Sequence, residues 1–542
     1  MLFVQLHNTK IWLLVGILFL IKSGFCQSFS KATIIGGDSN DEIIKIQSDQ
    51  HCELQLAGTF RETFHGIPSI GKSDVFLSSL KEDLIEWTMG MGSTEVDEVY
   101  DLKRTAQGEL ILAGSFVKDG FFQDLQLQTS LSSKASFILK MQDEEILWLK
   151  KLNGTSLEGI GELQIDEAGH IYVCGQFNSD LSFDDEQIVT EADEGLFVLK
   201  LTANGELIWM RSFGEQGLIR PKHLEFSEAK DRLFISGEFK GEMQFADDFI
   251  ETNTADLDVF VASMDADGNP LWAKKAGGVL EDQNNDLLLD EQGHLFLTGN
   301  FRGRLEIDDL LLETTGTLDD NFYLLKLNEN GQPLWGRSIG KREGSETGFA
   351  FLEFDENSIW MSGYCSSDFE VDDIRFDPQD DALLHPFLGS FSKEDGNFDW
   401  IIGLEDADGI IVPDVLHRTD CDQYFLGGAI NGSLSLEGQS FESTEYDGFL
   451  LEILPPQPNS ISNAVETLLS FSISPNPNDG WLQIKNDSNG LFSLYNVGGQ
   501  LLREIPLFKG SSGISFEYDA GIYFWVFLSE NGEQLRGKLL RN

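Results

Sequence analysis

The chain has 542 residues, of which 41% are apolar and 11% aromatic, so it can fill a large core and does not have the composition of a disordered protein. Its formal net charge is −53, and residues 468–542 carry seven acids and six bases, so nearly all the negative excess lies upstream. So acidic a surface repels phosphate groups, which excludes nucleic acid and anionic lipid as favoured partners; it equally suits a protein that must stay soluble in salty water. The length predicts about two to four domains.

The first 26 residues have the pattern of a signal peptide. Lys10 gives a positive start, residues 11–21 form an apolar run, and the small Ser23 and Gly24 follow. We expect cleavage before Gln27; attachment of a lipid to Cys26 is the alternative, and the bulky Phe25 fits it poorly. The apolar run is too short to span a membrane and no later segment approaches about eighteen apolar residues, so no transmembrane segment is predicted.

A strand-like run with a central Phe recurs seven times between residues 27 and 454, at intervals of 60 to 65 residues. The runs are DVFLSSL (Phe76), ASFILKM (Phe137), GLFVLKL (Phe197), DVFVASM (Phe260), NFYLLKL (Phe322), HPFLGSF (Phe387) and DGFLLEI (Phe449). A strand containing Gly precedes each Phe run, at Gly58, Gly114, Gly175, Gly237, Gly299, Gly363 and Gly427 or Gly428. A strand containing Trp follows the first six, at Trp87, Trp148, Trp209, Trp272, Trp335 and Trp400. We refer to these units as repeats 1 to 7.

Each repeat predicts four antiparallel strands. The runs have strand length without a helical period, and TAQGE, DEAGH, DADGN and NENGQ between them have the Asn/Asp/Gly chemistry of tight turns. Seven such units predict a seven-bladed β-propeller, in which radial closure hides most sheet edges. An excursion of about 15 to 20 residues precedes each Phe strand, and we expect it to form a short hairpin on one face.

The two ends of the repeat region predict that the propeller closes on itself. Repeat 7 has no Trp strand, because its Phe strand leads directly to Leu454-Pro455-Pro456. The segment from Lys31, KATIIGGDSNDEI, aligns with WTMGMGSTEVDEV around Trp87. The N-terminal strand should therefore complete the last blade.

The repeats resemble the bacterial seven-bladed propeller repeat known as SBBP. The matching residues are IDEAGHIYVCGQF followed by LFVLKLTANGELIW, with Gly175, Phe197 and Trp209 at the family's positions. The resemblance covers about residues 31–454 and implies a fold, not a chemistry, because propellers host many functions. The long excursions depart from the usual pattern.

Residues 455–467, with Pro455, Pro456 and Pro458, are expected to be a linker, and residues 468–542 to be a small β-sandwich. This segment resembles the type A C-terminal sorting domain of the type IX secretion system. The matching residues are Pro475-Asn476-Pro477, the turn from Asn496 through Gly499 to Leu501, the strand Gly521-Ile522-Tyr523, and the basic Lys538 and Arg541 near the end. The resemblance implies export, recognition by that secretion machinery and delivery to the cell surface or the medium.

Candidate chemistry is sparse. Acidic pairs recur in four excursions, at Asp184-Asp185, Asp247-Asp248, Asp308-Asp309 and Asp372-Asp373. They offer oxygen ligands for Ca²⁺, but Asp-Asp is also ordinary turn chemistry, and turns in adjacent blades are too far apart to share one ion. Otherwise no cofactor is expected. His170 and His294 occupy equivalent turns, and no metalloprotease, serine hydrolase or phosphate-binding motif is found, so no catalytic residue is assigned.

Cys52 and Cys421 are disulfide candidates, whereas Cys174 and Cys365 are expected to be buried thiols. Each of the first two lies about six residues before the Gly of its repeat, in repeats 1 and 7, which closure makes neighbours. Export permits a disulfide, provided that the two Cα atoms lie within about 7 Å. The sequence thus favours a non-enzymatic surface protein that binds a protein or glycan; the alternatives are a polysaccharide-active enzyme with its site at the central channel, and a structural surface component.

Overall fold

Every regular element of the described residues is a β-strand, as expected for an all-β protein. The computed structural model describes residues 28–454 and 471–541 except for short gaps. These gaps are residues 38, 82–83, 130–133, 192–193, 215–216, 253–255, 315, 317–319, 341–349, 356–357, 366–368, 372–373, 377–383, 404–406, 437–438, 475–480, 487, 497–500, 516–517, 519–520 and 530–533. Within the described part, no helix is long and apolar enough to cross a membrane. The expected signal peptide and linker lie outside the described residues.

Two compact units make up the chain. One contains residues 30–372 and 380–452. The other is formed mainly by residues 453–542 and also includes residues 373–379.

The larger unit is built from the sequence repeats. Repeats 1 to 6 each contribute four main antiparallel strands, and repeat 7 contributes three. Repeat 1 forms β2 (Glu42–Ser48), β3 (Leu54–Phe60), β6 (Asp74–Lys81) and β7 (Leu84–Met91). Repeat 2 forms β8 (Glu98–Arg104), β9 (Leu110–Val117), β12 (Lys134–Gln142) and the first part of β13 (Glu145–Ile165). Repeat 3 forms the rest of β13, β14 (Ile171–Phe183), β16 (Gly195–Leu201) and β17 (Leu207–Phe213). Repeat 4 forms β18 (Leu218–Ser227), β19 (Arg232–Lys240), β22 (Asp258–Asp265) and β23 (Pro270–Ala276).

The remaining repeats follow the same order. Repeat 5 forms β24 (Asp286–Leu289), β25 (Leu295–Arg302), β28 (Asp320–Leu327) and β29 (Pro333–Ile339). Repeat 6 forms β30 (Ala350–Phe354), β31 (Ser358–Cys365), β34 (His385–Ser392) and β35 (Phe398–Gly403). Repeat 7 forms β36 (Ala407–Arg418), β37 (Tyr424–Leu436) and β38 (Gln439–Leu454), and β1 (Ser28–Ile35) from the N-terminal end is the fourth strand of this sheet, beside β38.

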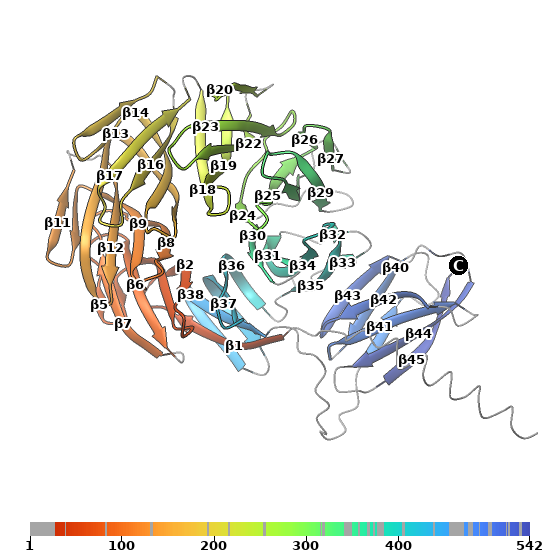
Figure 1. Ribbon diagram of the computed structural model, residues 1–542. Coiled ribbons are helices and arrows are strands. Elements are labelled where there is room, and N and C mark those ends of the chain that lie inside the picture. Colours follow the sequence, from red (N-terminus) through yellow and green to blue (C-terminus); the bar gives the residue numbers. More distant parts are fainter. Residues whose placement is uncertain are drawn as a thin grey trace, which may run out of the picture. The chain divides into compact units, whose positions relative to one another are not determined.

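The sheets lie around a common centre, which is a propeller-like arrangement (Figure 1). The first strand of each sheet contacts the first strand of the next, from β2 through β8, β13, β18, β24 and β30 to β36, and β36 in turn contacts β2. We call these seven the inner strands. One departure from separate sheets occurs between repeats 2 and 3: β14 extends to Phe183 and pairs with residues 152–165 of β13, so the connection remains a strand and the two sheets are continuous.

Apolar side chains fill the spaces between successive sheets. Ala57 and Leu77 of repeat 1 share a core with Leu112 and Phe137 of repeat 2. Later repeats continue the pattern, and Leu450 of repeat 7 packs into one core with Ile43, Leu56 and Phe76 of repeat 1. The Phe strands are almost wholly buried because sheets cover them on both faces.

The Trp residues join one repeat to the next. The indole Nε1 of Trp148, Trp209 and Trp272 each donates a hydrogen bond of 3.2 Å to a carbonyl in the Asn/Asp/Gly turn of the following repeat. In the DADGN turn, Gly268 has φ +85°, and a Cβ there would lie 3.2 Å from the Trp209 ring. The turn therefore needs Gly both for its backbone conformation and for the indole that packs on it.

In repeats 1 to 5 the excursions form two-stranded hairpins, as expected. They are β4 (Thr63–Phe64) with β5 (Ile67–Pro68), β10 (Asp119–Phe122) with β11 (Leu125–Gln128), the end of β14 with β15 (Glu186–Val189), β20 (Glu242–Phe245) with β21 (Asp248–Glu251), and β26 (Arg304–Ile307) with β27 (Leu310–Glu313). In repeat 6, β32 (Phe369–Val371) and β33 (Ile374–Phe376) occupy this place in the chain. Two hairpins also bond to the residue directly after the fourth strand of the preceding repeat, through bridges between Gly92 and Phe121 and between Gly277 and Glu306. They thus cover part of an otherwise free sheet edge.

The smaller unit is a sandwich of two sheets. The C-terminal strands that form these sheets are β39 (Phe471–Ser474), β40 (Trp481–Asn486), β41 (Gly490–Asn496), β42 (Leu501–Leu507), β43 (Gly510–Ser515), β44 (Gly521–Ser529) and β45 (Gln534–Arg541). One sheet has the order β42-β41-β44-β45, and the other includes β43-β40-β39. Leu482 and Ile514 from one sheet pack against Phe492 and Phe527 from the other, so this unit has its own core.

Candidate functional site

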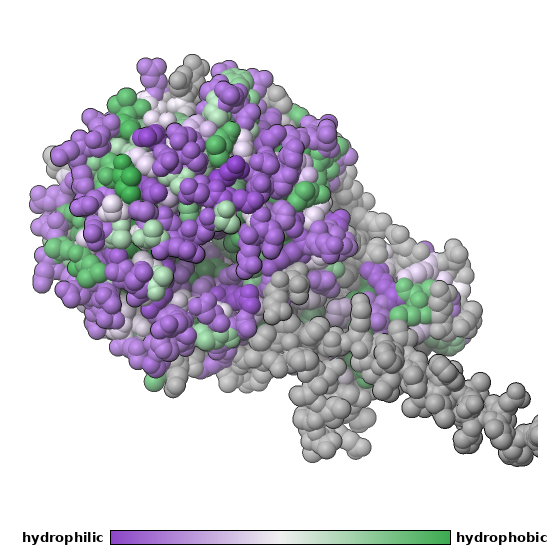
Figure 2. All heavy atoms as spheres, in the orientation of Figure 1, coloured by the Kyte–Doolittle hydropathy of each residue, from purple (hydrophilic) through white to green (hydrophobic). Residues whose placement is uncertain are grey.

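A pocket of about 510 Å³ opens among the inner strands of the larger unit. Its wall is formed by Tyr100, Gly159, Ile160, Gly161, Gln176, Arg220, Pro221, Lys222, His223, Asn284, Asn285, Phe351 and Asp414. These residues come from repeats 2 to 7, and we call this cavity the axial pocket. The volume is typical of small-molecule sites. The face of the molecule in Figure 2 is mainly hydrophilic, with apolar residues in small groups.

β-Bulges shape the wall of the axial pocket. The pairing of the inner strand with its neighbour shifts by one residue at Tyr100 in β8, Gly161 in β13, Lys222 in β18 and Asp414 in β36. A bulge leaves its extra residue out of the ladder and bends the strand, so the same irregularity in several repeats directs four different side chains or backbones to one place. Gly161 is required for close approach, since a Cβ there would lie 2.6 Å from the Pro221 carbonyl oxygen.

The cations on the wall already have anionic partners. Arg220 donates two hydrogen bonds to Glu194, of 2.7 and 3.0 Å, and Lys222 Nζ lies 2.5 Å from Glu238 Oε1. The Tyr100 hydroxyl donates to Glu98 over 2.9 Å. Charge on this side of the axial pocket is therefore compensated within the protein.

Two groups on the wall have buried polar atoms without a hydrogen-bond partner in the described part of the chain. Asn285 exposes only 5% of its surface, and neither its Oδ1 nor its Nδ2 is bonded. The Oδ2 of Asp414 is likewise buried and unbonded. Such atoms are rare in folded proteins and are usually satisfied by water or a ligand.

Glu42 lies beside Asp414 and perturbs it. Burial raises the pKa of Asp414 well above its usual value, and the neighbouring Glu42 raises it further. Burial also raises the pKa of Glu42, against a hydrogen bond with Asp414 that lowers it. Two carboxyls this close hold a proton between them more readily than an isolated one.

Charged residues line the axis further along the inner strands. Lys103 Nζ lies 2.8 Å from Glu162 Oε1 and 3.7 Å from Asp101, and His223 Nδ1 lies 3.6 Å from both Glu162 and Asp286. Burial opposes ionisation of Glu162, but Lys103 and His223 outweigh it and hold the pKa of Glu162 far below its usual value.

Some of these acids also join repeats to one another. Glu162 accepts the backbone N–H of Leu224 over 2.9 Å, and Asp286 accepts that of Leu352 over 2.7 Å. Each bond links an inner strand to the next one. We therefore assign this layer a structural role.

The acidic pairs considered for Ca²⁺ lie at hairpin turns. Asp184-Asp185 connects β14 to β15, Asp308-Asp309 connects β26 to β27, and Asp247-Asp248 lies where β20 meets β21. Lys150 is 2.8 Å from Asp184 and Lys274 is 2.9 Å from Asp308, while Asp248 accepts the N–H of Ala273. Asp372 and Asp373 lie outside the described residues. Among the described residues, no three His, Cys, Asp or Glu side chains are grouped to hold a metal ion.

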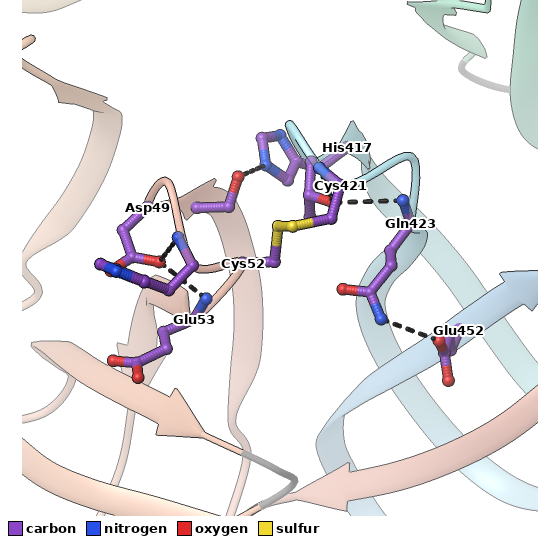
Figure 3. The surroundings of a disulfide bond; sticks show 10 residues. Asp49, Cys52, Glu53, His417, Cys421, Gln423 and Glu452 are labelled. Carbon is purple, nitrogen blue, oxygen red and sulfur yellow. Dashed lines mark hydrogen bonds and ion pairs between the residues drawn. A yellow bond between two sulfur atoms is a disulfide. The ribbon is translucent and has the colours of Figure 1, made fainter.

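The two cysteines of repeats 1 and 7 are joined by a disulfide, with Cα atoms 6.1 Å apart (Figure 3). Asp49 accepts the backbone N–H groups of His51 and Glu53 around one cysteine, and Thr419 accepts the N–H of Cys421 at the other. Next to the bond, His417 Nε2 lies 3.0 Å from Ser48 Oγ. Cys174 and Cys365 are buried thiols outside any disulfide, and the Cys365 thiol donates to the His385 carbonyl over 3.5 Å.

The motif residues of the C-terminal segment are placed as follows. Gly521 and Tyr523 lie in β44, Tyr523 being buried, and Lys538 and Arg541 lie in β45. Pro475, Asn476, Pro477 and Gly499 are outside the described residues. His170 and His294 occupy equivalent turns, where the Nδ1 of each lies 2.8 Å from an Asp.

The sequence did not single out any residue of the axial pocket as functional. A usable signal exists: Lys45, Asp101 and Glu162 each lie 13 positions before the Gly of their repeat, and His223 lies 14 positions before Gly237. These strands otherwise have the apolar pattern of buried strands. Charged side chains at the same position in several of them indicate a layer of charged residues around the axis. Asn285 and Asp414 carry no motif that would identify them.

No protein-family model matches the chain, and no curated protein matches it in sequence. The chain is similar in structure to the hydrazine synthase of Kuenenia stuttgartiensis, with 10% identity over 61% of this chain and 78% of that one and a TM-score of 0.36. It is also similar to a gluconolactonase from Xanthomonas campestris (12% identity, 62% and 96% covered, TM-score 0.28) and to the polysaccharide lyase Uly1 (9%, 80% and 98%, TM-score 0.42). At these values the similarities carry no inference about activity.

Proposed function

We propose that the chain is an exported surface protein in which a seven-bladed propeller binds an extracellular ligand at the axial pocket without transforming it. The observation that carries this proposal is the axial pocket, whose wall is formed by residues of six repeats. In it, buried polar atoms of Asn285 and Asp414 lack partners in the described part of the chain. A cavity at a point where many strands converge, with a mostly apolar wall and a few polar groups, is a usual place for a ligand site.

Seven blades are supported by three features of the repeat region. The inner strands contact one another in a cycle, β1 adds to the sheet of repeat 7, and the cores continue from repeat 7 into repeat 1. The disulfide and the hydrogen bond from the Asp41 N–H to the Tyr446 carbonyl join the same two repeats.

Export is supported by the sequence of both ends and by the disulfide. The N-terminal apolar run and the four motifs from Pro475 to Arg541 fit a protein exported by a type IX-like route, with the secretion machinery as partner of the C-terminal unit. A disulfide that joins two distant parts of one chain is typical of an oxidising compartment. We expect the mature protein at the cell surface or in the medium.

Binding is favoured over catalysis because the basic side chains on the wall of the axial pocket already have carboxylate partners. Arg220 and Lys222 are held by carboxylates, and His223 lies between Glu162 and Asp286. The pair Glu42 and Asp414 favours a second candidate, an enzyme acting on polysaccharide, because a carboxyl with a raised pKa is what a general acid requires.

The two candidates are separated by exposing the purified full-length chain to a glycan array and then incubating it with each polysaccharide that it retains. We expect retention with no change in polysaccharide length. Shortening of a retained polysaccharide, abolished by Asp414→Ala, would replace the binding function with the enzymatic one.

A further inference from the structure

The unbonded polar atoms in the axial pocket include both donors and acceptors. The Asn285 amide provides two N–H donors and one acceptor oxygen, and Asp414 Oδ2 provides a further acceptor or, when protonated, a donor. The backbone N–H of Asn285 donates to the Thr298 carbonyl over 2.8 Å, so the position of this residue is fixed by the sheet. A ligand that satisfies both residues must donate as well as accept hydrogen bonds.

The charge around the axial pocket disfavours an anionic ligand. The chain carries a net charge of −53, and the only two wall cations of Arg or Lys type in the described residues, Arg220 and Lys222, are neutralised by Glu194 and Glu238. A phosphate or carboxylate would therefore enter a negative field without a free cation to receive it.

A cationic ligand is disfavoured because an ammonium or guanidinium group only donates hydrogen bonds. It would leave the amide donors of Asn285 without an acceptor. Hydroxyl groups are uncharged and both donate and accept, so a polyhydroxylated ligand matches all of these constraints.

The apolar part of the wall restricts the class of ligand further. The half-buried ring of Phe351 and the side chain of Ile160 give the axial pocket an apolar component beside its polar groups. A sugar ring has an apolar C–H face and a rim of hydroxyls, and aromatic side chains pack on such faces.

We infer that the axial pocket seats one uncharged sugar unit, with the Asn285 amide and the Asp414 carboxyl bonded to its hydroxyls and Phe351 against its apolar face. This inference rests on the proposed binding function and specifies its ligand. A polysaccharide would be held by a terminal or exposed unit that enters the axial pocket.

The test uses three probes with the same ring and different charge: glucose, glucuronic acid and glucosamine, with galactose and mannose as further neutral sugars. Binding to the purified full-length chain is measured by saturation-transfer NMR and titration calorimetry, for the wild type, Asn285→Leu, Asp414→Ala and the control Asn330→Leu, which alters an exposed turn. We expect at least one neutral sugar to bind, the first two variants to weaken it by at least about tenfold, and the control to bind as the wild type does.

Hydrogen exchange of the wild type keeps the test valid if a variant fails to fold: the bound sugar should slow exchange around residues 284–286 and 412–415. Preference for glucuronic acid or glucosamine, or binding that leaves both segments unprotected, would overturn the sugar inference while leaving the binding function in place. Binding of none of these sugars would also overturn it, whereas the binding function fails only if retained polysaccharides are degraded.

Discussion

Cys52 and Cys421 form a disulfide with Cα atoms 6.1 Å apart, although 369 positions separate them in the chain. The bond joins a turn of repeat 1 to a turn of repeat 7, beside the contact between Ser48 and His417. It therefore closes covalently the same junction that β1 closes by strand pairing.

Removing this disulfide should lower the free energy of unfolding substantially. In the chain-entropy model a loop of this length is worth on the order of 5 kcal/mol, less any strain in the folded state. Cys52→Ser combined with Cys421→Ser should lower the denaturant midpoint. The control is Cys174→Ala, which removes a thiol but no cross-link and so should not cause this loss of chain constraint. Non-reducing peptide mapping should find Cys52 linked to Cys421; four free thiols in the exported protein would contradict the bond.

Deleting Lys31–Gly37 should destabilise the larger unit by several kcal/mol and promote aggregation. The deletion removes most of β1, exposes the edge of β38 and takes Ile35 from the shared core of repeats 7 and 1. Thermal unfolding and size-exclusion chromatography measure both effects, with a seven-residue deletion inside 456–467 as control. An unchanged melting temperature would mean that β1 does not contribute to closure.

Two buried carboxyls should make the protein less stable as the pH rises. Burial raises the pKa of Asp97 to about 7; the neighbouring Asp74 also raises it, and hydrogen bonds from Ser93 oppose the shift. Burial raises the pKa of Asp282 to about 8. Above the ordinary carboxyl pKa of about 4 the unfolded chain ionises, whereas these two carboxyls in the folded protein stay protonated. Their contribution to the free energy of unfolding is therefore complete below pH 4 and is lost as the pH rises to 8.

Asp97→Asn and Asp282→Asn should therefore raise the free energy of unfolding at pH 8, measured by urea titration, by at least about 1 kcal/mol each relative to the wild type, and have less effect at pH 5. The control is Asp267→Asn in an exposed turn. Equal effects at both pH values would show that the carboxyls are not protonated in the folded protein.

Truncation after Ser460 should leave the larger unit folded but retained in the periplasm. The C-terminal unit has its own core around Phe492 and Phe527, so its loss does not remove core residues of the repeats. Cell fractionation with surface proteolysis measures the location, and circular dichroism of the purified product measures folding. Arrival of the truncated protein at the cell surface would refute the sorting role.

The sequence by itself determined the strands, their turns and the pairing between the two ends of the repeat region. Alternating and apolar runs, Gly-containing turns such as DADGN and the recurring Phe and Trp are local signals, and repetition multiplies them. The missing strand of repeat 7 and the equal offsets of Cys52 and Cys421 from their Gly residues then followed from counting.

Only the tertiary structure decided where a site lies. The axial pocket takes between one and four residues from each of six repeats, and Asn285 and Asp414 belong to repeats 5 and 7. Bulges in the inner strands, which depend on how neighbouring sheets pack, turn Tyr100, Lys222 and Asp414 toward one cavity. The pattern of strands along the chain does not predict such convergence. Each of these residues is ordinary within its own repeat, and it forms part of a site only because residues of other repeats lie opposite it.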